Sequence, residues 1–70
     1  MEAREAGSMV RAHLARTGST AKVRAREVSF EDLARGSRVF VDVTGGPSYA
    51  DRTFWAPIQA LGTMHGFIVS

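Results

Sequence analysis

The sequence contains no cysteine, which removes two common means of stabilising a short chain. A domain of 70 residues buries only roughly 60% of its unfolded surface, so small domains commonly rely on disulfides, metals or self-association. Disulfides and cysteine-based zinc sites are excluded, and two histidines make a poor substitute. We therefore expect one small domain without a metal ion or cofactor, and we expect it to form a homodimer, the most common symmetric assembly.

Long apolar runs are also absent from the sequence. No segment is long enough to span a bilayer, and the charged start of the chain lacks the apolar core of a signal peptide. With the lack of cysteine, this favours a cytoplasmic protein without a membrane partner. Arginine outnumbers lysine by eight to one beside many alanines and glycines, which indicates a GC-rich coding sequence and a bacterial source.

No motif specifies a catalytic reaction. His13 and His65 lie at opposite ends of the chain, and neither the P-loop pattern nor the dinucleotide-binding fingerprint occurs. Asp42 and Asp51 could form a carboxylate pair across a loop, but no further residue supports acid–base chemistry. We predict no catalytic residue and expect a binding or adaptor module. The alternative from a different class is a structural subunit of a larger assembly.

The strongest local pattern is the alternation at residues 38–43. Val39, Val41 and Val43 share one face of a strand, and β-branched residues favour this conformation. Phe40 lies among the polar residues of the other face, so that face also contacts another surface. We predict a central strand here, with Phe40 as a candidate interface residue.

Two further elements are predicted before this strand. Apolar residues recur at helical spacing over residues 2–17, although residues 1–8 could instead be disordered or a remnant of cloning. Residues 22–28 alternate between basic and apolar side chains, which is typical of a half-exposed strand. Residues 29–32 resemble a helix N-cap and predict a single helical turn before the central strand.

Another helix and another strand are predicted after the central strand. An apolar helical face that includes Trp55 begins near Thr53, with Pro57 near its first turn, and residues 67–69 suit a buried strand. Trp55 packs in the core or, if it is exposed, lies in an interface. The predicted fold is α+β with the order α-β-β-α-β and a βαβ unit over residues 38–69. An antiparallel hairpin over residues 53–69 is the alternative.

Basic residues are concentrated in the first part of the chain. Residues 1–26 contain six cations and two acids, whereas residues 27–70 contain three cations and five acids. Lys22, Arg24 and Arg26 share one strand face at spacings of about 7 Å, comparable to successive phosphates. They could bind nucleic acid or an anionic protein surface, or simply protect an edge strand from aggregation. No aromatic residue is interleaved with them in sequence, which argues against base stacking.

The glycine-rich loop at residues 44–51 is a second candidate site. Loops between a strand and a helix bind anions in many α/β proteins through backbone amides. Thr44, Gly45, Gly46 and Asp51 would line such a site. The alternative function is therefore a small-ligand-binding domain or minor enzyme with its pocket at this loop, although such loops commonly serve only as turns.

Overall fold

The computed structural model describes residues 1–29 and 37–70. Within them, the elements in chain order are α1 (Ala3–Thr17), β1 (Lys22–Ser29), β2 (Ser37–Thr44), α2 (Arg52–His65) and β3 (Ile68–Val69). The predicted α-β-β-α-β order of a small α+β fold is confirmed. The helical turn predicted at residues 29–32 lies, apart from its first residue, outside the described residues.

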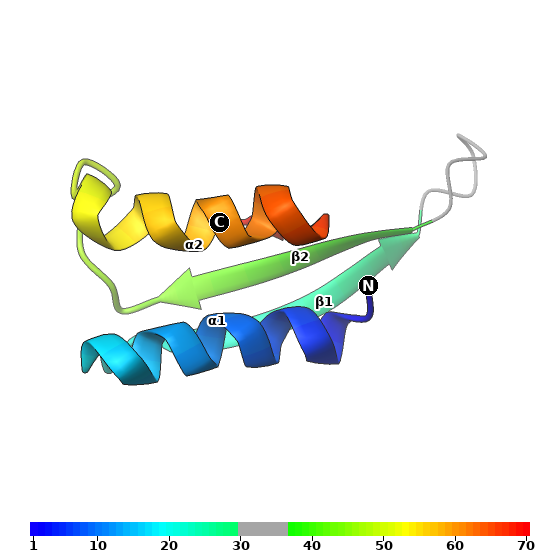
Figure 1. Ribbon diagram of the computed structural model, residues 1–70. Coiled ribbons are helices and arrows are strands. Elements are labelled where there is room, and N and C mark those ends of the chain that lie inside the picture. The colour runs from blue at the N-terminus through cyan, green and yellow to red at the C-terminus, as the bar shows by residue number, and fades with distance from the viewer. Residues whose placement is uncertain (30–36) are drawn as a thin grey trace.

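β2 is the central strand, with β1 on one side and β3 on the other. Figure 1 shows β1 and β2 side by side. β1 pairs with β2 in antiparallel orientation, with Lys22 opposite Thr44 and Arg26 opposite Phe40. β3 pairs with β2 in parallel orientation, with Ile68 opposite Phe40, so α2 is the crossover of a βαβ unit. The βαβ prediction over residues 38–69 is confirmed, and the hairpin alternative over residues 53–69 is wrong because α2 occupies most of that range.

Both helices pack on the same face of the sheet and enclose the core (Figure 1). Val39, Val41 and Val43 point toward the helices and are buried, Val41 completely. The rest of the buried core comes from α1, from α2 and from the residue before β3: Ala6, Val10, Leu14, Trp55, Ile58 and Phe67. The strict alternation of valines in β2 therefore reflects a strand covered by helices on one face.

α1 ends where its sequence indicates. Gly18 adopts the left-handed conformation at a φ of 75°, and its amide donates to the carbonyl oxygen of Ala15. Ala6 and Gly7, which lie within residues 1–8, are buried against the sheet. At Gly7 a β-carbon would lie 3.1 Å from the β-carbon of Ala25, so the absence of a side chain there lets α1 approach β1 closely.

α2 begins at Arg52, with Asp51 as its N-cap. The Asp51 carboxylate accepts a hydrogen bond from the amide of Phe54, a common way to satisfy the free amides of a first turn. Pro57 lies within the helix, where it cannot donate to the preceding turn. Across residues 1–29 and 37–70, no helix is both long and apolar enough to cross a membrane.

Candidate nucleic-acid interface

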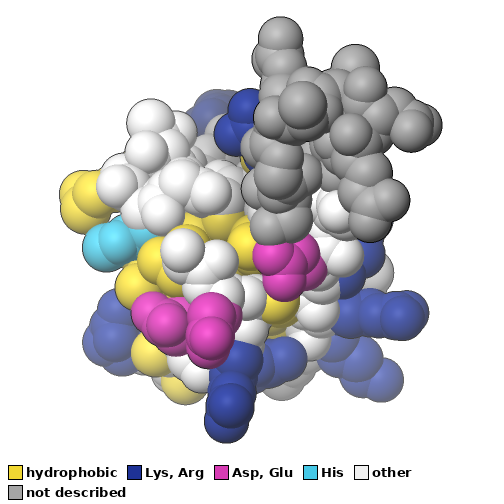
Figure 2. Space-filling view, turned by 90° about the vertical axis from the view of Figure 1, so that its right-hand side faces the viewer, with side chains coloured by type: hydrophobic (Ala, Val, Ile, Leu, Met, Phe, Trp, Pro, Cys, Tyr) yellow, Lys and Arg dark blue, Asp and Glu magenta, His cyan; other side chains and the backbone are white. Residues whose placement is uncertain are grey.

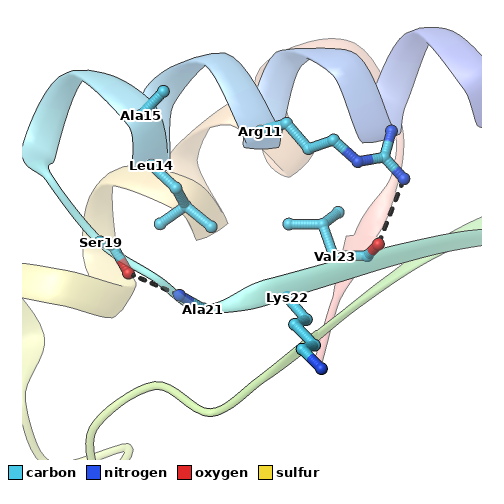
Figure 3. Close-up of a pocket in the computed structure, with 7 residues that line it drawn as sticks. All are labelled: Arg11, Leu14, Ala15, Ser19, Ala21, Lys22 and Val23. Carbon is cyan, nitrogen blue, oxygen red and sulfur yellow. Dashed lines mark hydrogen bonds between the residues drawn. The ribbon is translucent and has the colours of Figure 1, made fainter.

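The face of the sheet that is turned away from the helices carries the basic residues of β1. Side chains alternate between the two faces of a strand, so Lys22, Arg24 and Arg26 point away from α1 while Val23 and Ala25 pack toward it. The close-up in Figure 3 shows this alternation, with Val23 directed toward α1 and Lys22 directed away. We call this surface the open face.

The strand register places residues of all three strands side by side on the open face. Its central row contains Arg26, Phe40 and Ile68. The neighbouring rows pair Val28 with Arg38, Arg24 with Asp42, and Lys22 with Thr44. Figure 2 views the molecule from the side and shows lysine and arginine side chains at its right-hand margin as well as at its left side and lower edge.

Arg26 is held over an aromatic ring. Its guanidinium carbon lies 4.7 Å from the centroid of the Phe40 ring, a cation–π distance. Its Nε donates to the Asp42 carboxylate at 3.0 Å. Both side chains of this ion pair are partly exposed, so the pair adds little stability but fixes the guanidinium above Phe40.

Asp42 is the acidic residue of the open face. Its carboxylate accepts hydrogen bonds from the Ser70 hydroxyl at 2.6 Å and from Arg26. The Ser70 hydrogen bond, followed by the Arg26 hydrogen bond and charge, lowers the pKa of Asp42 below its ordinary value. Asp42 is therefore ionised at neutral pH and balances part of the charge of Arg26.

The cations on the open face exceed the acids. Among the paired residues that the structure describes, Lys22, Arg24, Arg26 and Arg38 stand against Asp42, which is four positive charges to one negative. Of the four cations, only Arg26 forms an ion pair with a described residue. The other three are exposed, so their guanidinium and ammonium groups point into solvent, where phosphates or carboxylates can approach them.

The sequence pattern did not reveal the aromatic component of this surface. No aromatic residue is interleaved with the cations along β1, but strand pairing places Phe40 of β2 beside Arg26. The position of Phe40 on the polar face of its strand was the feature of the sequence that could have indicated an aromatic residue on this surface. Once β1 and β2 pair, that face joins the basic face of β1.

The residues predicted to form a ligand loop lie at the end of β2 and in the connection to α2. Gly45 has a φ of 80°, which only glycine adopts readily, and a β-carbon on Gly46 would lie 3.0 Å from the Phe54 ring. Thr44 is exposed, and Asp51 caps α2. Asp51 also lines a pocket of about 230 Å³ between α1 and α2, together with His13.

Trp55, predicted as a weak interface candidate, is a core residue in this structure. Only 3% of its surface is exposed, and its Nε1 donates to the carbonyl oxygen of Pro47 at 3.1 Å. Its ring contacts Tyr49 and Phe54, at centroid distances of 4.5 and 5.0 Å. The interface interpretation required an exposed ring, so Phe40, which is half-buried, is the remaining interface candidate.

Metal binding has no visible basis in the described part of the chain. Within residues 1–29 and 37–70, no three His, Asp or Glu side chains are grouped closely enough to hold a metal ion.

No protein-family model matches the chain, and no curated protein or solved structure is significantly similar to it.

Proposed function

We propose that the chain is a non-catalytic binding module whose open face binds single-stranded nucleic acid. The observation that carries this proposal is the pair of Arg26 and Phe40 on an uncovered sheet face, flanked by Lys22, Arg24 and Arg38. Single-strand binding surfaces combine cations that contact phosphates with planar groups on which bases stack. The open face provides both kinds of group.

The geometry supports one arrangement in particular. The Arg26 guanidinium lies over Phe40, so a base that stacks on the guanidinium extends a column of flat groups. Lys22 and Arg24 follow on the same strand at intervals of about 7 Å, which matches consecutive phosphates of an extended strand. Arg38 lies beyond Phe40 along β2, where it can contact the backbone of the next nucleotide.

A salt titration tests this proposal. We expect a fluorescently labelled 12-nucleotide RNA or DNA to bind at low salt, measured by anisotropy. On single strands, each phosphate contact contributes about −0.7 to the slope of a plot of the logarithm of the binding constant against the logarithm of the salt concentration. About three contacts therefore predict a slope near −2. Replacing Lys22 and Arg24 together with serine should weaken binding by about tenfold and make the slope shallower.

A charge-matched variant provides the control. Arg4 and Arg16 lie on α1, are exposed, and change the net charge equally when both become serine. Phe40→Leu keeps the apolar character but removes the ring beneath Arg26, and should also weaken binding. Undetectable binding at low salt would refute the proposal. If the Arg4 and Arg16 variant lost as much affinity as the Lys22 and Arg24 variant, binding would depend on net charge alone and the open face would not be the site.

We also propose that the module is a homodimer that pairs through the region of β3. β1 suits this role poorly, because antiparallel pairing of two copies would bring the cations of both strands together. Near β3, Met64 is 73% exposed and Ile68 is 45% exposed, on either side of the turn that leaves α2. These two side chains offer apolar area at the edge of the sheet opposite to β1.

Light scattering at micromolar concentration tests the dimer. We expect a mass near twice the 7.6 kDa of the chain, and a melting temperature that falls on dilution. Changing Met64 and Ile68 together to serine should give the monomer mass and a melting temperature close to that of the dilute wild-type chain, because both side chains are exposed and only the stabilisation by the dimer is lost. A wild-type mass of 7.6 kDa that does not change with concentration would rule out this dimer.

A further inference from the structure

We infer that the outer edge of β1 is a second binding site, which accepts an extended acidic peptide as an added strand. In the described sheet, β1 pairs with β2 on one side only. The backbone groups on its other side are therefore directed away from the sheet, where an extended chain can hydrogen-bond to them. This inference uses the backbone edge of β1, together with the cations of the open face that lie beside it.

The hydrogen bonds between β2 and β3 establish which backbone groups face outward. The Val43 amide donates to the Ser70 carbonyl, and the Ser70 amide donates to the Val41 carbonyl, so the backbones of Val41 and Val43 face β3. Because the backbone direction alternates along a strand, Phe40 and Asp42 face β1.

The register then determines the direction in β1. Arg24 and Arg26, opposite Asp42 and Phe40, face β2, so the amides and carbonyls of Val23 and Ala25 face outward. A contact from α1 agrees with this assignment. Arg11 Nη2 donates to the Val23 carbonyl oxygen at 3.1 Å from outside the sheet, as Figure 3 shows.

A groove of about 450 Å³ lies directly beside this edge (Figure 3). It runs between the second half of α1 and the start of β1, and Leu14, Ala15 and Val23 provide its apolar lining. A strand added to β1 would direct every second side chain to the helix side of the sheet, toward this groove. Those positions of the ligand should therefore be apolar.

The other side chains of an added strand would lie on the open-face side, beside Lys22, Arg24 and Arg26. Three cations at alternate positions complement a strand with Asp or Glu at alternate positions. The same charges oppose pairing with a second copy of β1, which would place arginine against arginine. The occupant that fits the edge is therefore a peptide that alternates acidic and apolar residues.

The experiment uses an eight-residue peptide with alternating Glu and Val and blocked ends. We expect it to bind the full chain and to shift the amide resonances of Val23 and Ala25 most. A peptide with Lys in place of every Glu should bind at least about tenfold more weakly, because its cations would face those of β1.

Two N-methylated peptides with unchanged side chains distinguish strand addition from simple charge attraction. One carries the methyl groups on every Val and the other on every Glu, so only one set blocks the amides that face β1. Each lost main-chain hydrogen bond lowers the affinity by roughly a factor of five. The peptide whose methyl groups block the amides that face β1 should therefore bind at least about tenfold more weakly than the parent, while the other peptide binds almost normally.

The inference fails if the Glu-Val peptide does not bind, if both N-methylated peptides bind like the parent, or if the Lys-Val peptide binds equally well. Phe40→Leu separates this site from the nucleic-acid site. It should leave most of the peptide affinity, because the outward-facing backbone of Val23 and Ala25 and the cations Lys22 and Arg24 do not depend on the Phe40 ring. A parallel loss of peptide and nucleic-acid binding in Phe40→Leu would also contradict a separate edge site.

Discussion

Replacing Gly62 with alanine should lower the free energy of unfolding by about 3 kcal/mol or more, enough to leave much of the chain unfolded. A β-carbon at this position would lie 2.5 Å from the backbone carbonyl oxygen of Phe67, a distance that real atoms do not adopt. The carbonyl of Gly62 also accepts hydrogen bonds from the amides of Gly66 and Phe67. The clash therefore falls where α2 ends and the chain turns into β3.

The direction of this effect is opposite to the intrinsic helix propensity. Alanine is favoured over glycine inside a helix by about 1 kcal/mol, so a neutral environment would make the change stabilising. Gly66→Ala is the control, since Gly66 has a φ of 87° but nothing lies within 4 Å of its added β-carbon. We expect a loss of only about 1 kcal/mol there.

Urea denaturation followed by circular dichroism measures both variants. If Gly62→Ala were as stable as Gly66→Ala, the end of α2 and the start of β3 would be able to move apart and accommodate the added β-carbon without a loss of stability. The close approach of their backbones would then not be a feature of the folded chain in solution.

Replacing Trp55 with alanine should cost about 3–5 kcal/mol, the range found when a buried aromatic side chain is removed. Trp55 is 3% exposed and contacts the rings of Tyr49 and Phe54. Its Nε1 also binds the Pro47 carbonyl, so the same side chain holds the loop between β2 and α2 in place. Its removal should therefore loosen the loop as well as leave a cavity in the core.

Two milder variants separate these contributions. Trp55→Phe retains most of the apolar contact but removes the indole donor, so its loss of stability should be smaller. Tyr49→Ala removes a ring that is 57% exposed and should cost about 1 kcal/mol. Circular dichroism is the appropriate signal because the only tryptophan is changed. Equal stabilities for Trp55→Ala and Tyr49→Ala would show that Trp55 is not part of the core.

Local patterns in the sequence specify the helices and strands of this fold, and for that reason these elements could be predicted from the sequence. The valines of β2 alternate with period two, and the apolar residues of α1 and α2 recur with helical period. Gly18 ends α1 as its sequence indicates. The contact of Gly62 with Phe67, in contrast, depends on how α2 is placed against β3, which no local pattern specifies.

The candidate site was predicted only in part. The alternation of Lys22, Arg24 and Arg26 showed that they share a face, because this depends on a single strand. Their position beside Phe40 depends on the register between β1 and β2, which the two strands determine together. The burial of Trp55 likewise depends on its contacts with Pro47 and Tyr49, which the helical pattern alone did not reveal.

The packing of both helices on one face of the sheet has a consequence for how this protein can evolve. The helix-facing side chains of β1 and β2 are needed for folding, whereas Lys22, Arg24 and Arg38 on the other face make no ion pair with a described residue. Substitutions at such exposed positions usually change stability by less than about 0.5 kcal/mol. Selection or protein engineering can therefore alter the charge of the proposed binding surface while the core is unchanged. In this chain, the residues that form the core and those of the proposed binding surface occupy alternate positions of the same strands.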